Sequence, residues 1–389
     1  MQIPKQLLKI IDALEGCGYR ADIVGGSVRD FLLGDAPKDY DLATDATPDE
    51  VIAVLHEYRV LKTGIKHGTV TVMSEGEPYE ITTYRIDGEY NDARHPSSVT
   101  FTRTLAEDLA RRDFTMNALA YGKDGTLTDL YGGESDIKNK IIRTVGVASE
   151  RFTEDALRIM RALRFSSVLG FKIEEETARG MYLCRALINR VCAERIYSEL
   201  KKLILGTHAV EVIGEYREVL LSPLPELPAC EHIKDEGEFY RADLPTRLAA
   251  LFARSALDVF SAMMRRLRAD NKTRLAAEAV ILLVGADIST KRAVKRLLSS
   301  AGRGAVERLF AVRRILGDSC DGAILDEALT DGIPYKISDL ALSGTDLTEL
   351  GLSGEAVGKM LSRLLSEVIE ERLQNEREAL TEFVTKSIL

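Results

Sequence analysis

Two aspartates separated by one residue are the most chemically distinctive feature of the sequence. They occur in the segment Asp39-Tyr40-Asp41, which runs into the apolar residues Leu42 and Ala43. In a β-strand, side chains at positions i and i+2 project from the same face, about 6 to 7 Å apart. Two carboxylates at that spacing can share hard divalent cations, as two-metal phosphoryl or nucleotidyl transfer requires. The competing interpretation is a charged turn, because aspartate is common in turns.

A second motif ends nine residues before Asp39 and reads Val24-Gly25-Gly26-Ser27-Val28-Arg29-Asp30. A strand that ends in two glycines and turns into a helix exposes backbone N–H groups, which phosphate oxygens can approach without hindrance from side chains. Gly25, Gly26 and Ser27 would form this turn, and Arg29 would add positive charge. The pattern is neither GxGxxG nor GxxxxGK[ST], which excludes the dinucleotide and Walker motifs. An ordinary strand-to-helix turn is the alternative, but the nearby carboxylate pair favours a triphosphate site.

A third group of charged residues recurs with helical spacing. Asp155, Arg158 and Arg161 follow one another at intervals of three residues. Together with Arg164 they are expected to form a polar stripe along one helix face, and all four are candidate nucleotide-binding residues. The alternative is an i to i+3 ion pair on a helix surface.

Alternating helix and strand patterns are expected to position these residues. Apolar spacing predicts strands at residues 21–24, 40–43, 69–73 and 79–84 and helices at 4–14, 28–33 and 47–55. From Ile141 onward the periodicity is helical almost everywhere, with breaks at Gly206, 223–228, Gly302 and 332–334. The sequence therefore predicts an α/β head followed by an all-α remainder.

The composition narrows the class of protein. The chain has 389 residues and a net charge of −9, with 45% hydrophobic and 29% charged residues. This length predicts two or more domains, and the composition excludes a largely disordered chain. The longest apolar or small run, at 279–286, is much too short for the roughly 20 residues of a membrane span. The N-terminus lacks a secretory signal pattern, so we expect a cytoplasmic protein without a membrane span.

Positive charge is concentrated in residues 265–314, which contain thirteen Lys and Arg but four Asp and Glu, a net charge of +9. A basic helical stretch in an acidic protein can bind the phosphate backbone of a nucleic acid. Lys291, Arg292, Lys295 and Arg296 are the candidate RNA-binding residues. The alternative is a solvated helix face, which is what runs of charge usually form.

Taken together, the motifs resemble the signature of the DNA polymerase beta-type nucleotidyltransferase superfamily. The resemblance is to the class II branch, which holds the tRNA CCA-adding enzymes and bacterial poly(A) polymerases. It rests on GGSVRDFLLG, KDYDLAT, TGIKHGTVTV, EITTYR, EDLARRDFTMNALAY, EDALRIMRALRFS and ERIYSELKKLI, in this order. These motifs cover roughly the first 205 residues. Beyond them the resemblance is looser, although residues 340–380 are similar to the tail of bacterial class II CCA-adding enzymes.

The resemblance implies a catalytic role for three acids. Asp39 and Asp41 would hold Mg²⁺, and Glu80 is the candidate for a third carboxylate because the superfamily uses an acid on a neighbouring strand. The motifs contain no cysteine and few histidines, so Mg²⁺ on oxygen ligands is implied rather than zinc. No CxxC pair occurs, and we expect reduced, buried thiols at Cys17, Cys184, Cys192, Cys230 and Cys320.

The resemblance also implies how a nucleotide is bound and chosen. Arg112 and Asp113 would contact the ribose and triphosphate, with Asn117 nearby, although a surface ion pair is the alternative for the first two. Asp155 and Arg158 would recognise the base. Cytosine and adenine both present an amine donor beside a ring-nitrogen acceptor, whereas uracil and guanine present a carbonyl oxygen in place of the amine. An aspartate that accepts from the amine and an arginine that donates to the ring nitrogen would therefore select C and A.

The expected architecture is a polymerase beta-type head at residues 1–142, a helical neck at 143–205, a body at 206–315 and a tail at 316–389. The expected reaction is template-independent addition of CCA to the 3′ end of tRNA from CTP and ATP, with release of pyrophosphate. The body and tail would hold the tRNA acceptor arm by shape and phosphate contacts. The sequence leaves a monomer and a homodimer open.

Three other functions remain open at this point. A poly(A) polymerase or an enzyme that adds only CC or only A would share most motifs. Residues 86–98, predicted to be a mobile loop, resemble the loop that CCA-adding enzymes keep and that CC-adding specialists shorten. A non-catalytic RNA-binding scaffold would not need two repelling carboxylates side by side. A small-molecule nucleotidyltransferase would not need the long helical remainder.

Overall fold

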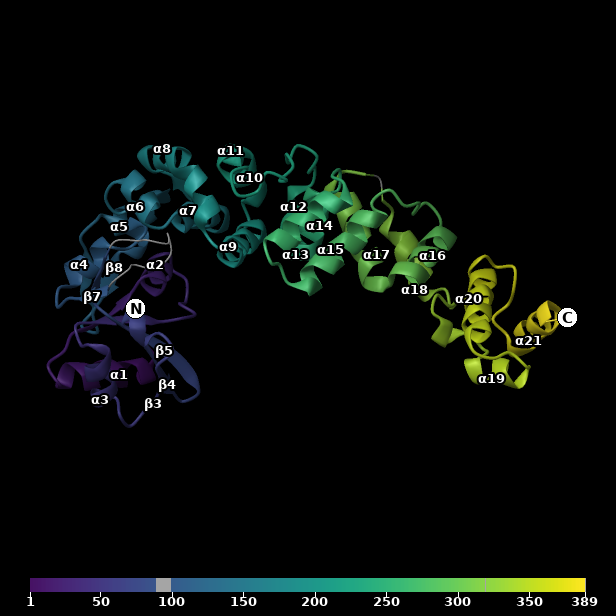
Figure 1. Ribbon diagram of the computed structural model, residues 1–389, viewed down its shortest axis with the longest axis horizontal. Coiled ribbons are helices and arrows are strands. Elements are labelled where there is room, and N and C mark those ends of the chain that lie inside the picture. The colour runs from purple at the N-terminus through teal and green to yellow at the C-terminus, as the bar shows by residue number, and fades with distance from the viewer. Residues whose placement is uncertain (89–98, 319, 389) are drawn as a thin grey trace. The chain divides into compact units, whose positions relative to one another are not determined.

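The computed structural model describes residues 1–88, 99–318 and 320–388 of the chain. These residues form two compact units, Met1–Pro225 (unit 1) and Glu226–Leu389 (unit 2). All strands among the described residues belong to unit 1, and unit 2 is helical. The predicted α/β head followed by a helical remainder is therefore confirmed (Figure 1). The finer division at residues 142, 205 and 315 stays a prediction.

Unit 1 is built around a seven-stranded mixed sheet with the strand order β3-β4-β5-β2-β1-β8-β9. Only β2 and β5 pair in parallel within this sheet, and the other neighbours are antiparallel. Its strands are β1 (Ala21–Val24), β2 (Asp41–Thr44), β3 (Arg59–Leu61), β4 (Thr69–Ser74), β5 (Glu77–Thr83), β8 (Leu119–Tyr121) and β9 (Leu127–Asp129).

The register of the three central strands brings distant motifs together. Val24, the last residue of β1, pairs with Asp41, and Asp41 pairs with Glu80 of β5. Val24 leads directly into the Gly25-Gly26 turn. The glycine turn and two of the predicted catalytic acids therefore lie side by side across adjacent strands.

Helices cover the sheet where the sequence supplies an apolar face and a helix start. Helix α1 buries Leu7, Ile10, Ile11 and Leu14 and contacts β1. Helix α3 begins after Thr47, whose side chain forms a reciprocal capping box that satisfies the first free N–H groups. Around the sheet and the 3₁₀ turn η2 (Thr115–Asn117), unit 1 has α1 (Lys5–Gly16), α2 (Gly26–Leu32), α3 (Pro48–Val54), α4 (Leu105–Ala110) and α5 (Gly133–Asn139).

The remaining helices of unit 1 pack in pairs, and Figure 1 separates them from α1 and α3. Helix α7 packs along α9, and α6 packs along α8. These elements are α6 (Ala148–Glu154), α7 (Leu157–Leu169), α8 (Glu175–Cys184), α9 (Ala193–Leu205), α10 (Ala209–Glu215) and α11 (Arg217–Leu220), with the short parallel pair β10 (Ile141–Ile142) and β11 (Lys172–Ile173).

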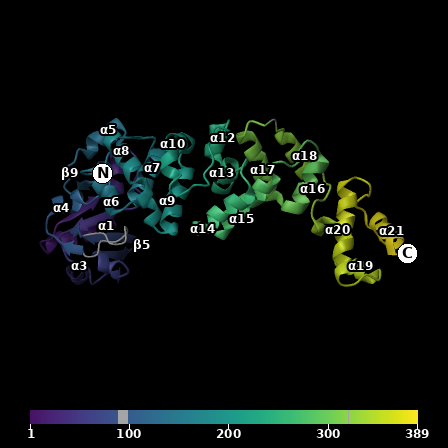
Figure 2. The same ribbon diagram turned by 45° about the horizontal axis from the view of Figure 1, so that its top comes forward.

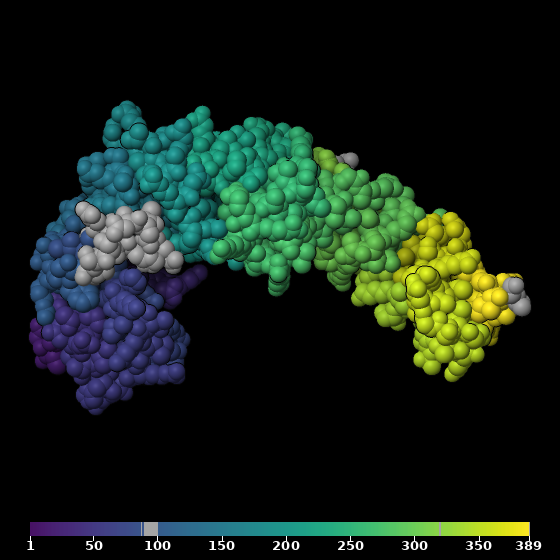
Figure 3. Space-filling model, viewed as in Figure 1, coloured from purple at the N-terminus to yellow at the C-terminus, as the bar shows by residue number. Residues whose placement is uncertain are grey.

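Two clusters of buried side chains in the described part of unit 2 join helices that are close in the sequence. One, around Phe310, joins α16, α17 and α18, and the other, around Leu364, joins α19, α20 and α21, drawn in yellow in Figure 3. Figure 2 shows α13, α15 and α17 side by side. The helices are α12 (Glu236–Arg241), α13 (Leu244–Leu251), α14 (Leu257–Arg266), α15 (Asn271–Leu283), α16 (Lys291–Ala301), α17 (Arg303–Ile315), α18 (Gly322–Thr330), α19 (Gly344–Glu349), α20 (Glu355–Ile369) and α21 (Arg377–Ile388).

The main sequence-based expectations about elements are confirmed, and three need comment. Strands of three residues, such as β3, β8 and β9, were not predicted because so few residues carry no periodic signal. All five cysteines are free, but the expected burial is confirmed only for Cys184 and Cys230. Cys192 and Cys320 are half-buried, and Cys17 is exposed after the end of α1. In the predicted loop at 86–98, residues 89–98 lie outside the described residues, and its flanks pair as β6 (Arg85–Asp87) and β7 (Val99–Phe101).

No helix in the described part of the chain is long and apolar enough to cross a membrane.

Candidate active site

A cavity of about 650 Å³ opens in unit 1 beside the glycine turn, β2 and β5. Its other walls come from the segment around η2, from α7 and from the start of α9. Twelve predicted site residues line it, and these are Gly25, Gly26, Arg29, Asp41, Glu80, Arg112, Asp113, Asn117, Asp155, Arg158, Arg161 and Arg164.

Two carboxylates form the acidic part of this cavity. Asp41 and Glu80 are paired residues of parallel strands, so their side chains lie on the same face of the sheet. Asp39 does not line the cavity, and the expectation that it lies on a strand with Asp41 is wrong, because β2 begins at Asp41. Desolvation by the cavity wall and then the charge of Glu80 raise the pKa of Asp41, and Asp39 adds a smaller rise. The acidic pair is thus made by strand pairing, with Asp39 close enough to act on Asp41 electrostatically.

These oxygen donors fit Mg²⁺. Within the described residues, no three His, Cys, Asp or Glu side chains are gathered closely enough to hold a metal ion by themselves. Mg²⁺ is usually held by one or two carboxylates together with substrate phosphates and water, rather than by a complete protein cage. Asp41 and Glu80, with Asp39 nearby, supply such a partial set. The mutual repulsion of Asp41 and Glu80 is also what a divalent cation would relieve.

The glycine turn brings the backbone close to an arginine. Gly25 has φ of 72°, and a Cβ built on it would lie 3.1 Å from Nη1 of Arg112. A residue with a side chain would therefore be strained and would push this guanidinium away. Ser27 is buried, and its hydroxyl donates to the carbonyl of Val24 at 3.0 Å. The Ser27 hydroxyl thus stabilises the turn and does not line the cavity, and a role of Ser27 at the nucleotide site stays a prediction.

The guanidinium of Arg112 is held by a buried acid, Asp108. Its Nη2 donates to Asp108 at 3.1 Å, and Arg111 donates to the same carboxylate at 2.6 Å. Burial alone would raise the pKa of Asp108, but the two arginines outweigh it and the pKa lies below its ordinary value. Asp108, which the sequence analysis did not single out, therefore stays ionised and fixes both guanidiniums at the cavity.

Asp113 connects three walls of the cavity. One oxygen accepts from Asn117 Nδ2 at 3.1 Å and the other from Arg161 Nε at 2.7 Å. Asn117 Oδ1 in turn accepts from Arg29 Nη1 at 2.8 Å. Burial would raise the pKa of Asp113, but Arg161 and Asn117 hold it at about 2. The alternative, a surface ion pair, is not what the structure contains between Arg112 and Asp113, because Arg112 pairs with Asp108 and Asp113 pairs with Arg161.

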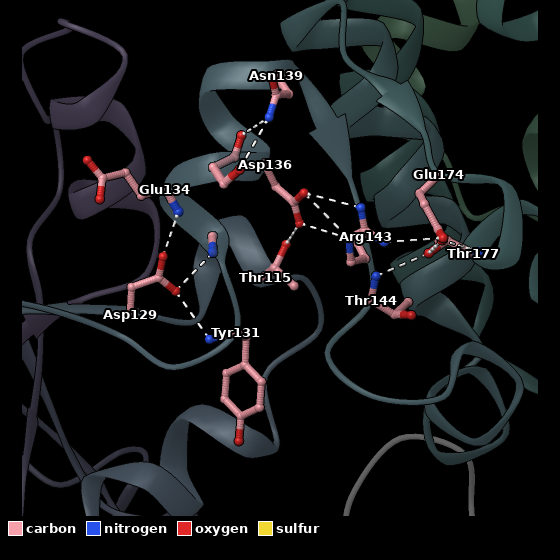
Figure 4. Close-up of polar contacts among 12 residues, drawn as sticks. Thr115, Asp129, Tyr131, Glu134, Asp136, Asn139, Arg143, Thr144, Glu174 and Thr177 are labelled. Carbon is pink, nitrogen blue, oxygen red and sulfur yellow. Dashed lines mark hydrogen bonds and ion pairs between the residues drawn. The ribbon is translucent and has the colours of Figure 1, made fainter.

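The turn that carries Asn117 is supported from the opposite side (Figure 4). Asp136, which is buried, lies between Thr115 and Arg143. It accepts from Thr115 Oγ1 at 2.6 Å and from Arg143 Nε at 3.1 Å. Arg143 also reaches Glu174 at 3.3 Å. A Cβ on Gly133 would lie 2.2 Å from the carbonyl oxygen of Thr115, so only glycine permits this close packing.

The two residues predicted to read the base both reach the cavity, but their side chains are held by different partners. Asp155 lies between α6 and α7 rather than on a helix, so the predicted stripe of four residues is wrong for this member. Its carboxylate accepts from Leu157 N at 3.0 Å and from Arg195 Nη2 at 2.8 Å. Arg158, which is 7% exposed, donates to Glu154 at 2.7 Å. The alternative of an ion pair between Asp155 and Arg158 is therefore not what the structure contains.

Several lining residues were missed by the sequence analysis although most lie inside the motifs quoted for the resemblance. Arg195 is the second residue of the ERIYSELKKLI motif, and Arg85 ends EITTYR. The Thr69 and Thr82 hydroxyls lie 3.0 Å apart on neighbouring strands. The available signal was that all three missed arginines lie inside the quoted motifs. The missed side chains are Thr69, Thr82, Arg85, Arg111, Phe165 and Arg195.

The candidate RNA-binding residues of unit 2 are all ion-paired. Lys295 is 1% exposed and donates to Asp331 and to the carbonyl of Ile333, so the expectation that it contacts RNA is corrected: its ammonium group is enclosed. Lys291 also pairs with Asp331, at 2.9 Å. At the surface, Arg292 pairs with Glu371 at 3.0 Å and Arg296 pairs with Glu370 at 2.5 Å.

Comparison with protein families assigns consecutive parts of the chain. A model described as the poly A polymerase head domain matches residues 21–143. A model described as an RNA- and SrmB-binding site of polymerase A matches residues 170–230. A model described as tRNA nucleotidyltransferase domain 2 matches residues 249–384.

Individual relatives match over nearly the whole chain. A protein of Limosilactobacillus fermentum named CCA-adding enzyme is 38% identical over 95% of this chain and 94% of its own. The CCA-adding enzyme of Bacillus cytotoxicus is 37% identical over 95% of both chains. The crystal structure of the Bacillus stearothermophilus CCA-adding enzyme in complex with CTP is 32% identical. It superposes with a TM-score of 0.83 over 99% of this chain and 97% of that one.

Proposed function

The chain belongs to the CCA-adding enzyme family of tRNA nucleotidyltransferases, and on this premise we propose that its unit 1 cavity adds CCA to the 3′ end of tRNA. CTP and ATP are the nucleotide substrates and pyrophosphate is released. The observation that carries the proposal is the convergence of the glycine turn, the Asp41–Glu80 pair and eight arginine side chains on one cavity. Such a cavity matches a nucleoside triphosphate, which is polyanionic and needs metal-binding carboxylates close to its phosphates.

The residues of this chain divide the work of binding the triphosphate. The Gly25-Gly26 turn offers backbone that no side chain covers, and Arg29 and Arg112 flank it. Both guanidiniums are fixed by protein acids, Arg29 by Asp30 at 2.7 Å and Arg112 by Asp108. Fixed donors need no reorganisation when the substrate arrives, which favours charge stabilisation during transfer.

The acids at the sheet are proposed to hold Mg²⁺ through Asp39 and Asp41, with Glu80 as the third carboxylate. When bound, Mg²⁺ would lower the pKa of the tRNA 3′-hydroxyl and neutralise charge on the departing pyrophosphate. Transfer forms a bond between that 3′ oxygen and the α-phosphorus and breaks the bond between the α- and β-phosphates. The hydroxyl proton leaves to solvent.

Base selection is proposed to rest on Asp155 and Arg158. Both line the cavity on the side formed by α7. Arg195 and the backbone N–H of Leu157 hold the Asp155 carboxylate, and Glu154 holds Arg158. A carboxylate held in this way accepts a hydrogen bond from the amine of cytosine or adenine and repels the carbonyl oxygen of uracil or guanine. The protein would thereby replace a nucleic-acid template.

We place tRNA acceptor-arm binding on unit 2 and the action of the enzyme in the cytoplasm, where this substrate is processed. Lys291, Arg292 and Arg296 remain proposed phosphate contacts, because exposed ion pairs are worth little and can exchange an acid partner for a phosphate. Lys295 is removed from this set by its burial.

One assay separates CCA addition from its rivals. Purified protein is incubated with tRNA that ends at the discriminator base, with CTP alone, ATP alone and both together. We expect two C additions with CTP alone, and one further A when ATP is present. A long A tail would indicate a poly(A) polymerase, and a stop after CC or a need for a preformed CC end would indicate a partial specialist. No incorporation would favour a non-catalytic scaffold or a small-molecule substrate.

A further inference from the structure

Phe165, the ninth residue of α7, has three guanidinium groups close to its ring. Guanidinium carbons lie 3.9 Å from its ring centroid in Arg164, 5.1 Å in Arg29 and 5.5 Å in Arg161. All four residues line the cavity. Cations within about 6 Å of an aromatic ring are attracted by its negative face.

We propose that Phe165 is a positioning residue that gathers Arg29, Arg161 and Arg164 into one triphosphate-binding group. This inference rests on the proposed function of the cavity and names a residue that the proposed mechanism does not yet use. Phe165 itself need not touch the nucleotide. It acts through the three guanidiniums that it holds.

The positive charges of Arg29, Arg161 and Arg164 explain why a positioning residue is needed. Three guanidiniums around one ring repel each other before the substrate binds. Each is ion-paired with an acidic side chain, Arg29 with Asp30, Arg161 with Asp113 and Arg164 with Glu199 at 3.1 Å. Desolvation lowers the pKa of Arg164 to about 10, so burial works against its charge even with Glu199 nearby. The ring stabilises cations without supplying a negative charge that would repel phosphates.

The ring is also fixed in place. Phe165 is 7% exposed and meets Phe114 edge to face, with centroids 5.8 Å apart and an interplanar angle of 85°. Phe114 follows Asp113 directly, and its backbone N–H donates to that carboxylate at 2.8 Å. The aromatic pair therefore ties the position of the arginines to the acid that holds one of them.

The mechanism predicts a distinctive kinetic effect. The triphosphate is common to CTP and ATP. Weakening the contacts between the Phe165 ring and the arginines should therefore raise KM for both nucleotides by the same factor and leave the ratio of the two KM values intact. Loss of binding that is shared by ground state and transition state raises KM with little change in kcat. A residue that only supported the fold would instead lower stability and the amount of active enzyme.

The test replaces Phe165 with mono-, di- and trifluorophenylalanine, which keep the shape of the ring while withdrawing charge from its face. We expect the Kd of CTP, measured calorimetrically without tRNA, to rise with each fluorine to about ten-fold for the trifluoro ring. KM for CTP and ATP should rise in parallel, with Tm unchanged. The same series at Phe152, which is buried on α6 and has no guanidinium over its ring among the described residues, is the matched control.

A Kd that stays constant along the series, or one that rises equally in the Phe152 series, overturns the inference. Phe165→Tyr should bind CTP like the parent and Phe165→Leu about ten-fold more weakly, and equal binding by the two also contradicts it. The binding readout is independent of the reaction. If the parent adds no nucleotide to tRNA, the proposed function fails, and the dependence of CTP binding on fluorination still decides the role of Phe165.

Discussion

The arginines of the unit 1 cavity and the basic residues at 265–314 of unit 2 are both clusters of positive charge, but their surroundings differ. At least ten of the thirteen cations at 265–314 form ion pairs, and at least seven of the acids involved lie outside that segment. The net charge of +9 counted along the sequence is thus largely cancelled in space. In unit 1, eight arginines and four acids from several elements face one cavity. Convergence of side chains, rather than local charge in the sequence, locates the binding site.

The largest effect should come from the acids of the cavity. Asp41→Asn keeps the shape of the side chain but removes its charge, so CMP and AMP incorporation should fall at least about 10³-fold. Asp39→Ala should have a similar effect, with tRNA binding retained. In unit 2, Arg303→Gln breaks an exposed pair with Glu307 and should leave the rate unchanged. Incorporation by Asp41→Asn near the parent rate would show that the metal assignment is wrong.

Within unit 2, Lys295 differs from the exposed cations because its ammonium group is enclosed. Replacing it by Met removes the charge that faces Asp331 inside the unit, although Lys291 still pairs with that acid. We expect a loss of about 2 to 3 kcal/mol in the free energy of unfolding, measured in urea, with little change in CTP affinity. Arg303→Met is the exposed control and should lose under about 0.5 kcal/mol. Equal stabilities for the two variants would contradict the structural role of Lys295.

The half-buried acid Asp113 should make the stability of unit 1 sensitive to pH. Its pKa of about 2 in the folded protein is lower than in the unfolded chain, so it stabilises the fold above about pH 4. That contribution, about 2 kcal/mol, should disappear as the pH falls from 4 through 2. Unfolding of the parent and Asp113→Asn should therefore differ most above pH 4 and converge in acid. A difference that does not depend on pH would exclude an ionised Asp113.

The smallest effects are expected at the surface of unit 2. Replacing Lys291, Arg292 and Arg296 by Ala should flatten the dependence of log tRNA affinity on log salt, by up to about 0.9 for each phosphate that the variant no longer binds. Lys359→Ala, which breaks an exposed pair with Glu355 on α20, is the control. An unchanged slope in the triple variant would mean that these residues form only a solvated face.

The sequence allowed much of the fold to be predicted because the strands and helices around the cavity have clear apolar patterns. β1, β2 and β5 were expected close to their observed bounds. The pairing of Asp41 with Glu80 could not be read from spacing, since it depends on parallel pairing between strands far apart in the chain. The position of Asp155 was also missed, because a local break between α6 and α7 removes it from the helical period.

The partners of the unit 2 cations also could not be predicted from the sequence, because they lie on segments far apart in the chain. Lys295 and Asp331 lie on different elements, so their contact arises only when α16 packs against α18. The resemblance placed Asp113 at the nucleotide site and helical spacing placed Arg161 on the polar stripe, but their direct contact needs the packing of α7 beside the η2 turn. Motifs thus predicted which residues matter, and tertiary packing determines what each one binds.

The central claim is that one cavity both transfers the nucleotide and chooses it, and Asp155 tests this most directly. Incorporation of each of the four nucleoside triphosphates is measured on tRNA ending at the discriminator base and on tRNA ending in CC. Asp155→Ala should slow CTP and ATP and reduce their preference over UTP and GTP by about 1 to 3 kcal/mol, whereas Asp41→Asn should slow all four alike. If Asp155→Ala slows all four equally and leaves their ratios intact, base choice does not reside in this cavity wall.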